Sequence, residues 1–87
     1  MTNKEFVRDN AINLSQNGNT MTGNDLVDSL NAAGFKTTYG THYINHSRGI
    51  FKLIHSTYDW LVNQGQKPIA DIVANTYTNA EGEPAWY

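Results

Sequence analysis

Apolar residues recur every three or four positions along four stretches of this chain, which is the spacing of amphipathic helices. The clearest stretch places Ile50, Ile54 and Leu61 on one face, with further apolar residues beside them. We expect this helix to form the centre of the core, because its apolar arc is wide. The pattern predicts helices over about residues 3–17, 23–33, 47–64 and 68–77.

The residues at the ends of these stretches are those that begin and end helices. Thr2 and Glu5 have the spacing of a capping box, in which each side chain accepts a bond from the other residue's backbone amide. Thr22 can cap the second helix, and Gly34 can end it in the left-handed conformation. Pro68 suits the first turn of the fourth helix. Local signals therefore agree with the periodicity.

Two short segments favour strands. Residues 35–39 are rich in threonine and aromatic side chains, and Gly40 breaks any helix there. A long loop follows, and long loops in compact domains are often functional. The apolar end of the chain around Trp86 is expected to fold back as a second strand over residues 84–87. The expected fold is mainly α: one compact four-helix domain over residues 1–87 with a small two-stranded β element.

Composition indicates how this domain is stabilised and in which compartment it is expected. The 87 residues include no cysteine, so the core must come from the 39% of residues that are hydrophobic. The N-terminus lacks the apolar run of a secretory signal, and no apolar run approaches the roughly 18 residues of a membrane span. We expect a cytoplasmic protein with no membrane partner.

Charge is unevenly distributed along the chain. Residues 29–58 contain no Asp or Glu but hold three of the six basic residues and all three histidines. This stretch carries +3 and the rest of the chain carries −5, which together give the formal net charge of −2. A basic patch on an acidic body indicates an anionic partner more directly than the total charge does.

The middle of this stretch offers the groups with which proteins bind nucleic-acid phosphates: cations, hydroxyls, amides and the free N–H groups of a helix N-terminus. Arg48 lies in a first helical turn, where its charge opposes the helix dipole, and such a placement is a hint of function. We therefore expect a DNA-binding surface, the alternative being a polar loop whose hydroxyls only satisfy turns. The candidate residues are Lys36, Thr37, Thr38, Tyr39, Thr41, His42, Tyr43, Asn45, His46, Ser47, Arg48 and Lys52.

The order of the expected elements resembles a small winged helix-turn-helix domain of bacterial or phage type. Thr22–Gly34 corresponds to the supporting helix of that fold and Ser47–Gln64 to its recognition helix, with residues 35–46 forming a longer connection than its usual turn. The resemblance implies a small DNA-binding protein with an accessory or regulatory role. It also implies that the start of the recognition helix faces DNA and that Glu83–Tyr87 form a reduced wing.

Metal binding and catalysis have weaker sequence signals. His42 and His46 are four residues apart, and His55 and Asp59 would share a helix face, but no closed set of four ligands is defined. We interpret them as exposed histidines and a surface contact. The common hydrolase, P-loop and dinucleotide-binding motifs are absent, and so small a chain has little room for a ligand cavity of about 300–1,000 Å³. We expect no metal, no cofactor, no small-molecule substrate and no enzymatic activity.

The alternative to DNA binding is a protein-binding or self-associating module. Tyr39, Tyr43 and Trp60 are not clearly buried by the helical pattern, and tyrosine and tryptophan are frequent interface anchors. Any one of these side chains is more often packed in the core than used as an interface anchor. If the chain self-associates, a symmetric homodimer is the commonest form of such an assembly.

Overall fold

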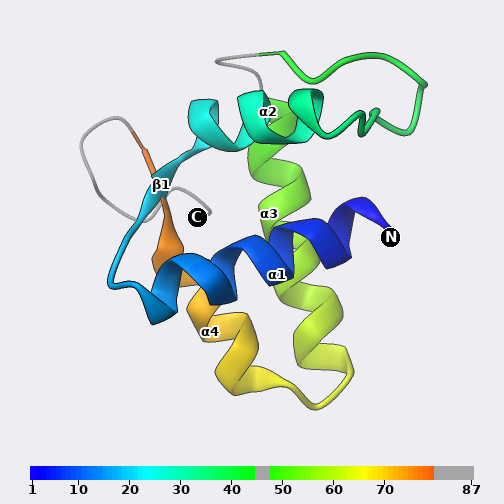
Figure 1. Ribbon diagram of the computed structural model, residues 1–87. Helices are drawn as coiled ribbons and strands as arrows, with labels where there is room; N and C mark the ends of the chain where they lie inside the picture. The colour runs from blue at the N-terminus through cyan, green and yellow to red at the C-terminus, as the bar shows by residue number, and fades with distance from the viewer. Residues whose placement is uncertain (45–47, 80–87) are drawn as a thin grey trace.

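The structure of this protein is a computed structural model that describes residues 1–44 and 48–79. The described residues form four helices and a two-stranded sheet, so the predicted fold class is confirmed (Figure 1). The helices are α1 (Asn3–Gln16), α2 (Gly23–Ala32), α3 (Arg48–Asn63) and α4 (Lys67–Thr76), and the strands are β1 (Met21–Thr22) and β2 (Tyr77–Thr78).

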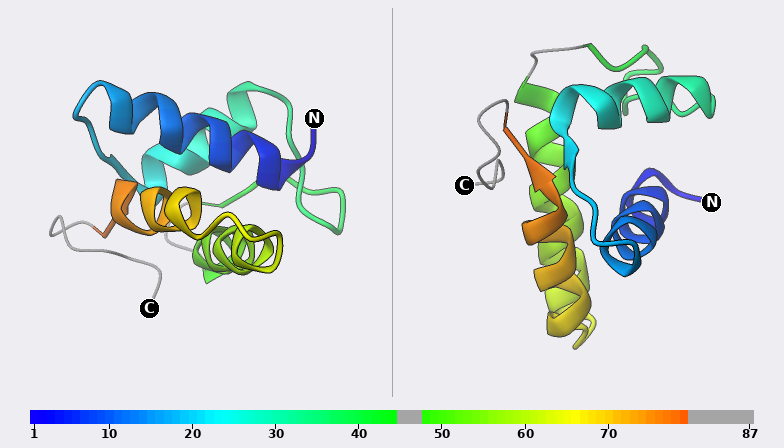
Figure 2. Two further views of the ribbon diagram at one scale, coloured as in Figure 1. Left: turned by 90° about the horizontal axis from the view of Figure 1, so that it is seen from below. Right: turned by 60° about the vertical axis from the view of Figure 1, so that its left-hand side comes forward.

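Three helices enclose most of the core. α3 and α4 lie side by side, α1 packs across both, and α2 lies near the N-terminal end of α3 (Figures 1 and 2). Ile50, Ile54 and Leu61 are buried on α3, as the periodicity predicted. The other elements contribute fully buried side chains to the same cluster: Val7, Ala11, Leu26, Leu30, Ala70, Val73 and Tyr77.

Three of the helices end in the same way. After α1, α2 and α3 a glycine adopts a positive φ, at Gly18 (69°), Gly34 (84°) and Gly65 (75°). The residue after each glycine donates its N–H to a carbonyl five residues back, which is the Schellman arrangement. At the start of α1, Thr2 and Glu5 form the predicted capping box, and the hydrogen bond from the Thr2 backbone amide lowers the pKa of the Glu5 carboxyl.

The short sheet joins the segment before α2 to the segment after α4. β1 and β2 run parallel, with Met21 beside Tyr77. The Tyr77 side chain is fully buried, and its hydroxyl donates to the carbonyl of Val7 at 2.7 Å and accepts from the side-chain amide of Asn10 at 3.2 Å. Burial raises the pKa of this hydroxyl. One side chain thereby ties the end of α4 to the middle of α1.

The strand predicted over residues 35–39 is wrong. Phe35 completes the cap that ends α2 and is partly buried against the core. The N–H of Thr37 donates to the carbonyl of Thr41 at 2.8 Å, so this backbone finds partners inside its own loop. The partner strand expected at residues 84–87 lies outside the described residues. The observed strands are two-residue segments, which are too short to produce an alternating pattern in the sequence.

Gly23 determines how closely α2 approaches α3. It is buried at the first position of α2, and a Cβ built there would lie 3.0 Å and 3.2 Å from ring atoms of Phe51. Such contacts are tighter than side chains normally make. The missing side chain therefore lets α2 begin directly against the first turns of α3, which carry part of the site described next.

Candidate nucleic-acid interface

The loop of residues 35–44 carries most of the predicted DNA-binding residues, and two asparagines fix it to the helices. Asn31, near the end of α2, accepts the N–H of Tyr43 at 3.0 Å and donates to the carbonyl of the same residue at 2.9 Å. Asn3, at the start of α1, donates to the carbonyl of Lys36 at 2.7 Å and to the hydroxyl of Tyr43. The loop (green in Figure 1) is therefore anchored although it has no regular secondary structure.

The loop closes on itself at its far end. The hydroxyls of Thr37 and Thr41 are 2.8 Å apart, and the N–H of Gly40 donates to the carbonyl of Thr37 at 2.9 Å. Gly40 has a φ of 77°, which only glycine adopts without strain. Tyr39 lies in this turn with 92% of its surface exposed. A fixed turn thus presents an aromatic ring to solvent.

A cavity of about 520 Å³ lies beside this loop. Its volume falls within the range of about 300–1,000 Å³ typical of ligand sites, so the expectation that the chain has little room for such a cavity is wrong. The lining combines hydroxyls, lysine side chains and tyrosine rings, and none of the lining residues is acidic. The loop contributes Thr37, Thr38, Tyr39, Thr41 and Tyr43, and the rest of the lining comes from α1 and α3.

Four residues of the lining were missed by the sequence analysis. Gly49, Leu53 and Ser56 lie on α3 at successive spacings of four and three residues, and Lys52 lines the same cavity. Gly49 and Ser56 are three and four residues from Lys52, and this helical spacing was a signal that could have identified them. Lys4 is different, because its place in the cavity depends on the packing of α1 against α3. No pattern in the neighbouring sequence predicts that packing.

Two basic residues outside the cavity are neutralised by acidic neighbours. Arg8 pairs with Asp9 at 2.8 Å, and that hydrogen bond raises the pKa of the guanidinium. Lys67 pairs with Asp71 at 2.5 Å, and this bond likewise raises the pKa of the ammonium group. Both side chains therefore have a carboxylate partner of their own.

The remaining lysines differ in having no described ion pair. Lys4 and Lys52 line the cavity, and Lys36 lies at the start of the loop with its Nζ 3.2 Å from Nδ1 of His42. Within residues 1–44 and 48–79, none of these three lysines forms an ion pair with a carboxylate. Within the described residues no carboxylate pairs with these ammonium groups, so they can bind an anion from outside.

The structure brings together half of the twelve predicted residues. Six of them line the cavity: Thr37, Thr38, Tyr39, Thr41, Tyr43 and Lys52. Tyr43 is only 9% exposed, so it forms part of the wall and supports the loop. Lys36 and His42 contact each other and are not part of the lining. Outside the described part of the chain lie Asn45, His46, Ser47 and the side chain of Arg48.

The aromatic residues considered as protein-binding anchors have different environments. Tyr43 is buried, and Trp60 is half-buried with the guanidinium carbon of Arg8 5.7 Å from its ring centroid. Tyr39 remains exposed, and the same loop also exposes 69% of Ile44. Among the three aromatic candidates, Tyr39 alone is exposed, and Ile44 lies near it in the same loop.

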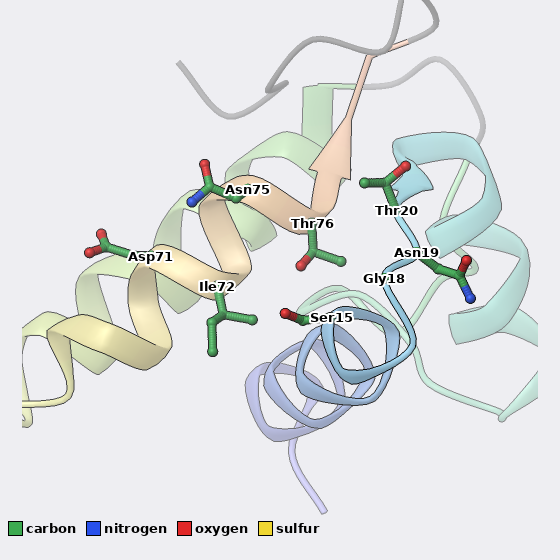
Figure 3. A pocket seen from close by; sticks show the side chains of 8 residues that line it. All are labelled: Ser15, Gly18, Asn19, Thr20, Asp71, Ile72, Asn75 and Thr76. Atoms are coloured by element: carbon green, nitrogen blue, oxygen red, sulfur yellow. The ribbon is translucent and has the colours of Figure 1, made fainter.

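A second cavity of about 310 Å³ lies between the end of α1 and α4 (Figure 3). Ser15 and Ile72 approach each other across it from the two helices. Its one charged lining residue is Asp71, which already pairs with Lys67. The two cavities thus differ in charge, and the one beside the loop is the one suited to an anion.

The described residues give no further sign of a metal or membrane site. His55 lies 3.7 Å from Asp59 on α3, which is the surface contact predicted for this pair. In the described ranges, no three His, Asp or Glu side chains gather in a way that could hold a metal ion. None of the helices there combines the length and apolar character that crossing a bilayer requires.

Protein-family models, curated proteins and solved structures give no match to this chain. Its function must therefore follow from the chemistry of the site itself. Three features require explanation: the acid-free cavity, the three lysines without carboxylate partners and the exposed ring of Tyr39.

Proposed function

We propose that this protein binds nucleic acid as a small non-enzymatic DNA-binding protein with an accessory or regulatory role. The binding site is the loop–α3 surface, defined as Lys4, residues 36–42 and the face of α3 from Gly49 to Ser56. The observation that supports this most strongly is that Lys4 and Lys52 line one cavity, with Lys36 in the loop beside it, and that none of the three has a described carboxylate partner.

The groups on this surface suit a phosphate backbone. Ammonium and hydroxyl groups are common phosphate ligands, and a lining without carboxylates does not repel the anion. Because the Thr37 and Thr41 hydroxyls bond each other, one of their two hydrogens is left to donate to a ligand. Ser56 adds an exposed hydroxyl from α3.

The resemblance to winged helix-turn-helix domains extends to the order of α2 and α3 in the chain and adds no contact to this site. The wing expected at Glu83–Tyr87 lies outside the described residues. With three lysines as the main cations, binding should be weak and largely independent of sequence. We expect dissociation constants of about 10⁻⁴–10⁻⁶ M at physiological salt.

Charge removal at single lysines tests this proposal. Lys52→Ala and Lys67→Ala remove the same charge from exposed positions on neighbouring helices, but only Lys52 belongs to the loop–α3 surface. In a fluorescence anisotropy titration at about 50 mM salt, Lys52→Ala should weaken oligonucleotide binding about five- to tenfold, and Lys67→Ala less than about twofold. Equal effects of the two variants, or no binding by the native protein, would contradict the proposal.

A second candidate function is a protein interface, which the exposure of Tyr39 and Ile44 in one loop favours. On this hypothesis Ile44→Ala should reduce self-association or capture of a protein partner while leaving the melting temperature unchanged. Light scattering that finds only monomer at high concentration would count against a homodimer.

A further inference from the structure

The concave form of the loop–α3 surface and the exposed ring of Tyr39 point to an unpaired nucleobase as the ligand. We infer that the protein prefers single-stranded nucleic acid, with one base stacked on Tyr39 and the adjoining phosphates held by Lys4 and Lys52. This inference rests on the proposed function and specifies the form of nucleic acid that the surface binds.

The shape of the site argues against a duplex. A helix that reads duplex DNA enters the major groove and must protrude from the protein to do so. On α3, the face from Gly49 to Ser56 lines a recess that it shares with the loop and with Lys4. A cavity of about 520 Å³ admits a single nucleotide but not a double helix.

Tyr39 supplies what an unpaired base requires. In a duplex the faces of the bases are covered by their neighbours, so only a splayed or single-stranded base can lie flat on an aromatic side chain. Tyr39 is 92% exposed, so little of the residue, its ring included, is covered by neighbouring groups. Stacking of one base on an aromatic ring raises affinity by about fivefold to a hundredfold.

The backbone that carries this ring is fixed before any ligand arrives. The bonds between Thr37 and Thr41 close the turn around Tyr39, and Asn31 and Asn3 fix the loop to α2 and α1. A preorganised loop loses little conformational freedom on binding. Lys4 and Lys52 line the same cavity as Tyr39, so a nucleotide on the ring has cations close to its phosphates.

The test compares two ligands and three variants of the full chain by anisotropy at about 50 mM salt. The ligands are an oligothymidine of about 20 nucleotides and a duplex of the same length, and the native protein should bind the oligothymidine at least about tenfold more tightly. Tyr39→Leu keeps apolar bulk but removes the aromatic face, so it should weaken oligothymidine binding about tenfold and leave duplex binding unchanged. Tyr39→Trp should retain the affinity. Ile44→Ala, an exposed apolar change in the same loop, is the matched control and should have no effect.

The outcomes separate this inference from the proposed function. Duplex binding that equals or exceeds oligothymidine binding, with a loss in Lys52→Ala, would overturn the preference for single strands and leave the proposed function standing. Unchanged oligothymidine binding by Tyr39→Leu would also overturn the inference. Absence of binding to both ligands would overturn the inference and the proposed function together.

Discussion

The side chain of Asn31 forms two hydrogen bonds with the backbone of Tyr43, accepting its N–H at 3.0 Å and donating to its carbonyl at 2.9 Å. The amide side chain thereby replaces a neighbouring strand for this stretch of the loop. Because Asn31 belongs to α2, the helix imposes its position on the loop that carries Tyr39. Asn31 therefore positions the loop–α3 surface although it is not one of the residues of that surface.

Asn31→Ala should therefore loosen the loop and weaken nucleic-acid binding. The substitution leaves the partly buried N–H and carbonyl of Tyr43 without their partner. The free energy of unfolding should therefore fall by about 1–3 kcal/mol. Urea denaturation measures this loss. Asn13→Ala, at an exposed position of α1, is the control and should stay within about 0.5 kcal/mol of the native protein. If both variants bind and unfold like the native protein, the loop does not depend on Asn31.

The salt dependence of binding should report how many lysines contact phosphate. For a single strand held by Lys4 and Lys52, the logarithm of the association constant should fall with the logarithm of salt concentration with a slope of about −1.4. Lys4→Ala or Lys52→Ala should make the slope shallower by about 0.7, and Lys67→Ala should leave it unchanged. A slope that none of the lysine variants alters would mean that the phosphates are bound elsewhere.

Tyr77→Phe should destabilise the fold by about 1–2 kcal/mol at neutral pH, because it removes the buried bonds to Val7 and Asn10. The variant should also change the response to alkali. Burial raises the pKa of the Tyr77 hydroxyl in the folded state, so the unfolded chain loses this proton first as pH rises above about 10. The stability that the native protein gains from Tyr77 is therefore present below about pH 10 and lost above it. Thermal melts from neutral to alkaline pH should show the difference between the two proteins shrinking above about pH 10, and a constant difference would contradict the buried hydroxyl.

The helices of this fold could be predicted from the sequence because their signals are local. The spacing of Ile50, Ile54 and Leu61, the pair Thr2 and Glu5, and the glycine after α2 each act within a few residues. The strands could not be predicted in the same way. Met21 and Tyr77 are far apart in the chain, and their two-residue strands exist only because the helices bring those segments together.

The candidate site was partly visible in the sequence for the same reason. Six predicted residues lie close together in the chain and line the cavity, since one anchored loop and one helix carry them. Lys4 could not be predicted, because it joins them only through the packing of α1. The anchors Asn3 and Asn31 were also missed, since an asparagine that bonds a distant backbone looks like any other polar residue in the sequence.

The central claim is that nucleic acid binds at the loop–α3 surface, and NMR amide shifts during an oligothymidine titration test it most directly. Binding there should shift the amide resonances of residues 37–41 and 49–56. The amide resonances of residues at the second cavity, such as Asn19, Thr20 and Asn75, should not shift. Shifts confined to the second cavity, or no shifts at saturating oligothymidine, would contradict the claim.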